Sequence, residues 1–161
     1  MKAVIQRVRN ASVSVEGKVT GAIDRGLLVY LGVASSDTEK DSEWMAEKTA
    51  NLRVFNDSQN KMNLSIKDLA KNIENNSLAE KSKTGVLVVS QFTLLGDASK
   101  GRRPYYGEAA EPVKANTLYE YFIKKIKEDG LLCESGVFQA HMDVSCINDG
   151  PVTILLDSQA K

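Results

Sequence analysis

Two stretches of the chain are apolar at nearly every position, and few folds can accommodate them. Residues 26–33 have the sequence GLLVYLGV, and residues 86–89 have the sequence VLVV. A strand with one solvated face alternates apolar and polar side chains, whereas a strand covered on both faces does not. We therefore expect a β-sheet whose central strands are buried on both sides.

The segments around these runs show the alternation that is typical of half-exposed strands. In residues 2–9, Val4 and Val8 fall on one face, and Ala3, Ile5 and Arg7 fall on the other. Alternation returns in residues 11–23, where the Glu16-Gly17 step predicts a hairpin turn. Further strands are predicted at residues 53–55, 85–94, 131–138, 142–147 and 151–157.

Two segments carry the signals of long helices. Ser36 and Glu39 have the spacing of a capping box, which predicts a helix through about Asn51. Glu111-Pro112 opens the second helix, and Gly130 ends it. The apolar residues of this second segment recur at helical spacing: Ala115, Leu118, Phe122 and Ile126.

These elements predict one domain over residues 1–161. The chain has 161 residues, of which 42% are apolar, and this is enough material for a core. We predict an α/β fold of the α+β type. Its sheets are largely antiparallel or mixed, or barrel-like, and two main helices pack against them. Residues 66–84 are polar and weakly periodic, so we interpret them as a surface excursion with one short helix.

The bulk composition excludes several functional classes. Lys+Arg and Asp+Glu both number 21, so RNA would have to bind a local patch rather than the whole surface. The opening MKAVIQRVRN is too short and too charged for a signal-peptide core, and no apolar stretch reaches membrane-spanning length. We expect a soluble cytoplasmic protein with no membrane partner, in which Cys133 and Cys146 are reduced, buried thiols.

The usual catalytic groups are scarce. His141 is the only histidine, and we interpret it as structural or exposed rather than as part of a catalytic pair. One histidine and two separated cysteines do not predict a metal site, and no phosphate-binding glycine motif occurs. We expect neither a metal nor an organic cofactor. Any catalysis must therefore use hydroxyls, amides, backbone groups or the substrate itself.

Two motifs remain. Ser90, Gln91, Phe92 and Thr93 directly follow the buried run at 86–89. Polar groups at this point either complete the hydrogen bonds of a strand end or build a site, and the residues alone leave both interpretations open.

The second motif is NDGPVT at 148–153. Gly150 can adopt backbone angles closed to other residues. Pro151 has no N–H, so it should open the last strand or lie at a bulge. On sequence statistics alone, the Gly150-Pro151 bond would be trans.

Together, SQFTL and NDGPVT resemble the D-aminoacyl-tRNA deacylase family. The resemblance extends to MKAVIQRVRNASVSVEG, GAIDRGLLVYLGV, NLRVFND, KMNLS, LVVSQFTL and KGRRP, in that order, and covers nearly the whole chain. Residues 66–85 depart from it, because they are longer than the connection usual in the family.

The resemblance implies a cytoplasmic homodimer that hydrolyses the ester between a D-amino acid and the terminal adenosine of tRNA. It implies that glycyl-tRNA is also cleaved and that L-aminoacyl-tRNA is left intact. The loop carrying Asn148, Gly150 and Pro151 would then contain a cis Gly-Pro bond and reach into the partner's active site. Its backbone carbonyls would hold the substrate's ammonium group, and an L side chain would collide with this main chain.

The same resemblance implies roles for the first motif. The N–H groups of Phe92 and Thr93 would stabilise the oxyanion, while Ser90 and Gln91 would hold the ester and the terminal ribose. The ribose 2′-hydroxyl would activate water. A nucleophilic Thr93 or Ser90 is a rival interpretation, and so is a module that binds tRNA ends without cutting them.

Two basic features also take roles from the resemblance. Arg7 would brace the Gly-Pro loop, although a surface charge is the plain alternative. Lys100, Arg102 and Arg103 would contact the phosphates of the tRNA acceptor end. A solvated basic loop is the alternative for these three.

Overall fold

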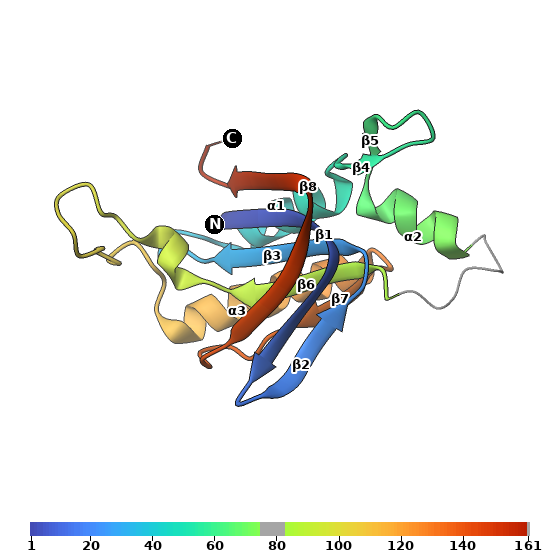
Figure 1. Cartoon of the computed structure of the whole chain (residues 1–161). Helices are drawn as coiled ribbons and strands as arrows, with labels where there is room; N and C mark the ends of the chain where they lie inside the picture. Colours follow the sequence, from blue (N-terminus) through green and yellow to red (C-terminus); the bar gives the residue numbers. More distant parts are fainter. Residues whose placement is uncertain (75–82, 161) are drawn as a thin grey trace.

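A mixed sheet and two long helices organise the chain (Figure 1). The computed structural model describes residues 1–74 and 83–160. In chain order the elements are β1 (Lys2–Val15), β2 (Lys18–Ile23), β3 (Gly26–Gly32), α1 (Glu39–Asn51), β4 (Phe55–Asn56), β5 (Met62–Leu64), α2 (Ile66–Glu74), β6 (Gly85–Ser90), the 3₁₀ turn η1 (Phe92–Leu95), α3 (Pro112–Glu128), β7 (Leu132–Ser135) and β8 (Asp143–Asp157). None of the helices in these residues is long and apolar enough to span a membrane.

The main sheet combines antiparallel and parallel pairs, as predicted. Strand β1 pairs antiparallel with β2, β3 and β8, whereas β3, β6 and β7 run parallel. The sheet curls until β2 lies close to β7. The closeness is clear at Gly21 of β2, where an added Cβ would lie 2.8 Å from the carbonyl oxygen of Ser135 in β7. The result is a nearly closed, barrel-like sheet.

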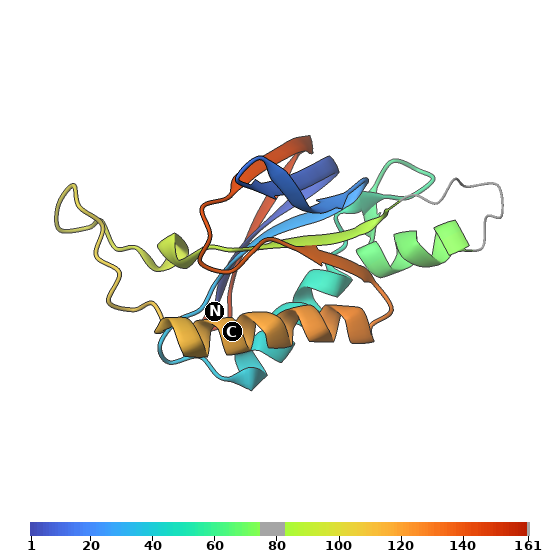
Figure 2. The same ribbon diagram turned by 90° about the horizontal axis from the view of Figure 1, so that it is seen from below.

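The two central strands are buried on both faces, which confirms the interpretation of the apolar runs. Helices α1 and α3 lie together against one face of the sheet (Figure 2). Leu27 and Val29 of β3 pack on that side with Met45 of α1 and Phe122 of α3. A second apolar cluster, inside the curl, joins residues of several strands: Val8, Ala11, Val13, Ile23, Leu28, Leu87 and Val89.

The first helix is capped differently from the prediction. The N–H and hydroxyl of Thr38 both donate to Asp41 Oδ2, at 3.0 and 2.8 Å, so Thr38 and Asp41 form the capping box and Ser36 does not. Residues 34–37 form a separate turn, because Asp37 accepts hydrogen bonds from the Ala34 N–H and the Met1 ammonium, both at 2.6 Å. The helix therefore begins at Glu39.

Three strand predictions are corrected. The strand predicted at 85–94 ends at Ser90, because its neighbour β3 ends at Gly32 and offers no further partner. The strands predicted at 142–147 and 151–157 are one strand, β8, with an internal irregularity. The strand predicted at 131–138 is shortened to β7.

The outcome for the remaining predictions is mixed. The hairpin turn is confirmed, with positive φ at Glu16 and Gly17. Cys133 is buried as predicted, but Cys146 is exposed because it lies on the outer strand β8. The short helix expected after residue 66 is α2, while residues 75–82 of that excursion lie outside the described residues.

Candidate active site

A cavity of about 570 Å³ opens where β6 ends beside the start of α3. Ser90, Gln91 and Phe92 form one part of its wall, and Ala110 and Ala115 form another. Most of the remaining lining is apolar: Leu31, Val33, Val89, Ala109, Pro112, Tyr119, Phe138, Ala140, Met142 and Val144. The first motif from the sequence therefore lies at the cavity, although Thr93 is not among the lining residues.

The backbone turns after Ser90 because the parallel pairing of β6 with β3 ends there. The Gln91 N–H donates to the Leu31 carbonyl at 2.8 Å, and the chain then turns into η1. The N–H groups of Phe92 and Thr93 are the first in this turn, so they have no carbonyl partner within it. The Gln91 side-chain amide donates to the Thr93 hydroxyl. The start of η1 thus places the N–H groups of Phe92 and Thr93 beside the Gln91–Thr93 side-chain pair at the rim of the cavity.

Phe92 is 59% exposed. Its ring meets that of Tyr106 edge to face, with 5.1 Å between the ring centroids. Tyr106 belongs to the long loop that leaves η1 and returns to α3. The aromatic pair therefore connects the cavity rim to this loop.

The second motif lies in an irregularity of β8. Gln6 of β1 faces Thr153 and Val8 faces Asn148, so Arg7 alone faces residues 149–152. The four residues form a bulge, so Pro151 lies at a bulge and does not open a strand, and the Gly150-Pro151 peptide bond is cis. The Asn148 amide donates to Thr153 Oγ1 at 3.0 Å across the base of the bulge.

Arg7 lies under this bulge and is only 8% exposed. Its Nε donates to the Asp149 carbonyl at 3.2 Å, and its Nη1 donates to the Val54 carbonyl at 2.6 Å. The plain alternative of a surface charge is therefore wrong. Buried charges require such partners, because burial without them is costly.

One chain does not bring the two motifs together. The path from Gly150 to Ser90 crosses three strand spacings, from β8 to β1, β3 and β6. It also runs four residues along β3, from Leu27, which pairs with Arg7, to Leu31, which pairs with Ser90. At about 4.8 Å per strand and 3.3 Å per residue, this path is roughly 20 Å along the sheet. Gly150 and Pro151 are exposed and do not line the cavity.

The comparisons with known proteins identify the family of this chain. The family model described as D-Tyr-tRNA(Tyr) deacylase matches residues 4–157. The chain belongs to this family. The D-aminoacyl-tRNA deacylase of Koribacter versatilis is 54% identical over 99% of this chain and 98% of its own length. That of Thermotoga petrophila is 54% identical over 98% of this chain and 97% of its own length.

Solved structures give the same fold. The structure of a c-Myc DNA Unwinding Element Binding Protein has a TM-score of 0.83 and 39% identity, and the match covers 98% of both chains. A probable eukaryotic D-amino acid tRNA deacylase has a TM-score of 0.78 at 15% identity, covering 96% of this chain and 97% of that one. The second of these shows the fold alone.

In this member of the deacylase family, one cavity wall was not predicted from the sequence. It is the connection between β7 and β8, which brings Phe138, Gln139, His141 and Met142 to the cavity. Gln139 has φ of +62°, a left-handed conformation that is uncommon for residues other than glycine. His141 is exposed, as expected, but it lies at the cavity. Neither Gln139 nor His141 lies in a sequence motif that would have indicated a position at the cavity.

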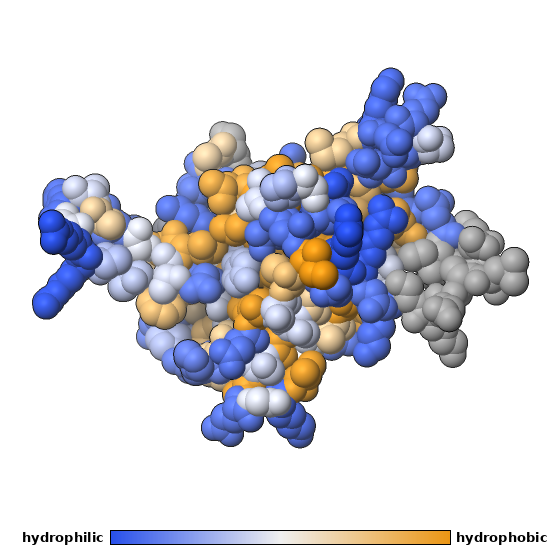
Figure 3. Space-filling model, in the orientation of Figure 1, coloured by the Kyte–Doolittle hydropathy of each residue, from blue (hydrophilic) through white to orange (hydrophobic). Residues whose placement is uncertain are grey.

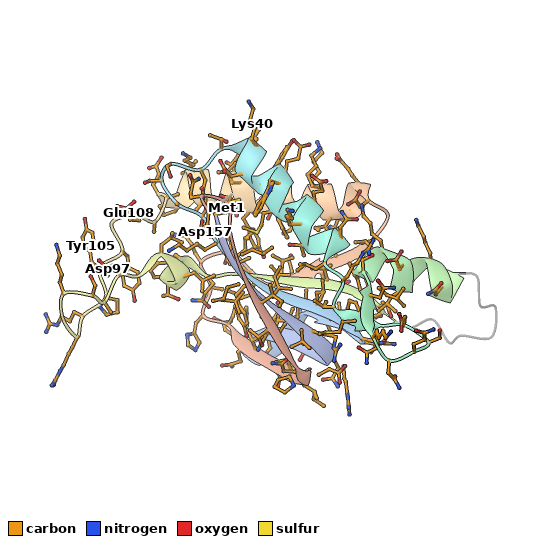
Figure 4. All side chains as sticks on the ribbon, turned by 90° about the horizontal axis from the view of Figure 1, so that it is seen from above. Met1, Lys40, Asp97, Tyr105, Glu108 and Asp157 are labelled. Carbon is orange, nitrogen blue, oxygen red and sulfur yellow. The ribbon has the colours of Figure 1, made fainter. Side chains whose placement is uncertain are left out.

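The basic residues lie on an arm beyond the cavity. Asp97 and Tyr105 exchange two backbone hydrogen bonds of 2.8 Å at the base of this loop, and they lie side by side in Figure 4. Lys100, Arg102 and Arg103 follow at its exposed tip, the hydrophilic projection in Figure 3. The Ser99 N–H lowers the pKa of the Asp97 carboxyl and stabilises the turn.

Among the described residues, no group of three or more His, Cys, Asp or Glu side chains is placed to hold a metal ion. At the cavity, the groups that can take part in chemistry are backbone donors, the Ser90 hydroxyl, the Gln91 amide and the His141 imidazole. Tyr119 does not offer a reactive phenol, because burial raises its pKa and its hydroxyl donates to the Val88 carbonyl at 2.9 Å.

Proposed function

We propose that this chain hydrolyses the ester bond of D-aminoacyl-tRNA, and also that of glycyl-tRNA, to release the free amino acid and tRNA in the cytoplasm. The observation that carries the proposal is full-length similarity to D-aminoacyl-tRNA deacylases at 54% identity, in a chain whose SQF residues line a cavity. The apolar lining suits a nucleoside, because bases bury apolar faces and aromatic rings stack on them.

The chemical step would rest on positioning. The ester carbonyl would lie at the N–H groups of Phe92 and Thr93, which stabilise the oxyanion of the tetrahedral intermediate. Ser90 and Gln91 would hold the ester and the ribose, and the 2′-hydroxyl would activate the attacking water. Thr93 is a poor nucleophile here, because its hydroxyl already accepts a hydrogen bond from Gln91 and no base lies beside it among the contacts of the described chain.

Chiral selection would come from the second motif of a partner subunit. Gly150 and Pro151 are exposed in one chain and are separated from Ser90 by a path of roughly 20 Å along the sheet, so a second copy would bring them to a cavity. In the described chain, β8 pairs only with β1, and its Leu155 is 76% exposed. An edge strand with exposed apolar side chains supports a homodimer.

At the cavity, the partner's backbone would exclude L side chains by collision and admit glycine, which has hydrogen in both positions. Each tenfold of selectivity requires about 1.4 kcal/mol, and a steric clash with fixed main chain supplies that readily.

The activity is tested with D-tyrosyl-tRNA, L-tyrosyl-tRNA and glycyl-tRNA. We expect release of D-tyrosine and glycine and retention of the L ester. A Ser90→Ala, Thr93→Ala double variant should keep substantial turnover, because neither side chain attacks the ester. Complete loss of turnover in a folded double variant would favour the nucleophilic mechanism instead.

The cross-subunit arrangement is tested by complementation. Ala115→Trp fills the cavity, and Gly150→Val disrupts the bulge, so each variant alone should be inactive. In a randomly mixed population, half of the dimers are heterodimers, and each has one intact cavity facing one intact loop. About one quarter of wild-type activity should therefore return. A mixture without any recovery would contradict a shared site.

The basic loop would bind the acceptor-end phosphates. Replacing Lys100, Arg102 and Arg103 by Ala should raise KM and reduce the salt dependence of binding, since each lost phosphate contact lowers the slope by about 0.7–0.9. Lys40 is the control, because it projects from α1 on a different part of the surface (Figure 4). An unchanged salt slope in the triple variant would mean that the loop is merely solvated.

A second candidate function is nucleic-acid binding without hydrolysis. It is favoured by the similarity to the 39% identical solved structure, whose protein is named for binding a DNA unwinding element. Binding of uncharged tRNA, together with no release from either the D or the L ester, would identify this function.

A further inference from the structure

The bulge that carries Gly150 cannot be held by the β-ladder alone. Arg7 is the single β1 residue that faces residues 149–152, so most of this segment has no register partner on β1. Bulges of this kind interrupt the ladder locally. The position of Gly150 must therefore depend on side-chain contacts.

Asp149 supplies these contacts from within the bulge. Its carboxylate meets two arginines of β1: Oδ2 lies 3.2 Å from Arg7 Nε, and Oδ1 accepts a hydrogen bond from Arg9 Nε at 3.2 Å. Arg7 and Arg9 project from the same face of the strand, because side chains two residues apart do so. One carboxylate thus ties the bulge to two positions of β1 that lie two residues apart.

Arg7 is itself anchored on its other side. Its Nη1 donates to the Val54 carbonyl at 2.6 Å and to Asn56 Oδ1 at 3.4 Å. The guanidinium is planar and its donors are fixed relative to one another. A guanidinium held by Val54 and Asn56 therefore presents Nε to Asp149 in one orientation.

Gly150 lies directly against this cluster. A Cβ added to Gly150 would lie 2.8 Å from Arg7 Nη2, so the glycine backbone and the guanidinium are already in close contact. Any displacement of Asp149 is passed to Gly150 through the next peptide bond. The side chain of Arg7 is 10% exposed and that of Asp149 is 25% exposed, so solvent screens this pair only partly.

We propose that Asp149 is a positioning residue that sets the D/L selectivity of hydrolysis by fixing the Gly150–Pro151 backbone through Arg7 and Arg9. This inference rests on the proposed function. Asp149 touches no reacting atom. It acts by holding main-chain atoms whose position decides whether an L side chain is excluded.

The test is Asp149→Asn, which keeps the shape of the side chain and removes its charge. The assay measures turnover of D-tyrosyl-tRNA and L-tyrosyl-tRNA by the wild-type and variant dimers. We expect the ratio of D to L turnover to fall about 10- to 100-fold, because small misplacements of positioning groups have effects of this size. Part of the fall should be a rise in L turnover above the wild-type rate, which loss of stability alone does not produce.

Asp143→Asn is the matched control. Asp143 lies on the same strand, is exposed and makes no ion pair within the described part of the chain, so its ratio should stay at the wild-type value. Arg9 is 72% exposed, and Arg9→Gln should change the ratio in the same direction but less. This second variant replaces Asp149→Asn if the latter does not fold.

The outcomes separate the two proposals. Wild-type protein that releases neither ester overturns the proposed function and this inference with it. Active, selective wild-type protein, together with a folded Asp149→Asn dimer whose D/L ratio stays within twofold of wild type, overturns this inference alone.

Discussion

Tyr119→Phe removes a buried hydrogen bond between α3 and the strand that leads to Ser90. Tyr119 is 1% exposed, and its hydroxyl donates to the Val88 carbonyl at 2.9 Å. A hydrogen bond of this kind contributes a net 0.5–1.5 kcal/mol, roughly. The Val88 carbonyl also accepts from the Gly136 N–H at 3.0 Å, so the substitution does not leave a buried acceptor without a donor. We expect a loss of about 1 kcal/mol in the free energy of unfolding.

Urea unfolding measures this loss as a lower midpoint with an unchanged m-value. For a chain of this size, 1 kcal/mol corresponds to a drop in Tm of about 2–4 °C. Tyr121→Phe is the control, because Tyr121 is half-buried and its ring faces Lys125. Its effect should stay within about 0.5 kcal/mol. Equal stabilities for Tyr119→Phe and wild type, or a loss above about 3 kcal/mol, would refute this account of the contact.

Three further predictions concern separate parts of the fold. Gly150→Ala should lower the free energy of unfolding by about 1–3 kcal/mol in urea titrations, because φ is +118° and the new Cβ would collide with Arg7. Burial raises the pKa of the Cys133 thiol to about 12, so iodoacetamide at pH 8 should modify it, by mass spectrometry, only after unfolding. Ser65→Ala should cost about 1 kcal/mol at pH 7, because Ser65 caps α2 with Asp68. Ser65 lowers the pKa of the Asp68 carboxyl, so the part of the wild-type advantage that depends on the Asp68 carboxylate is present above the ordinary carboxyl pKa and should be lost in acid titrations as pH falls through the lowered value.

Periodicity in the sequence was enough to predict the central sheet. The runs at 26–33 and 86–89 belong to β3 and β6, which are buried on both faces, and the turn at Glu16-Gly17 connects β1 and β2. Element ends were harder to predict, since they depend on distant partners. β6 stops where β3 stops, and Asp37 is drawn into a turn by Met1, 36 residues earlier.

The candidate site was predictable to the extent that its residues form short motifs. Ser90, Gln91 and Phe92 were predicted at a site and line the cavity. Gln139 and His141 were not predicted there, because only the tertiary fold brings their loop opposite β6. Asp149 was also missed, although it lies inside NDGPVT, because its partners on β1 are about 140 residues away along the chain.

Few titratable side chains line the cavity. A test of the chemistry should therefore change the position of the backbone donors of η1. A Cβ added to Gly32 would lie 2.6 Å from Leu95 Cδ2 and 2.8 Å from the Gln91 carbonyl oxygen, so Gly32→Ala must push η1 outward. It removes no side chain from the cavity. If backbone donors of η1 carry the chemistry, Gly32→Ala should lower D-tyrosyl-tRNA turnover about 10- to 100-fold, well beyond the effect of Ser90→Ala. Circular dichroism and the Tm establish that the variant is folded. Wild-type turnover in folded Gly32→Ala, combined with a large loss in Ser90→Ala, would transfer the chemistry from the main chain to the serine hydroxyl.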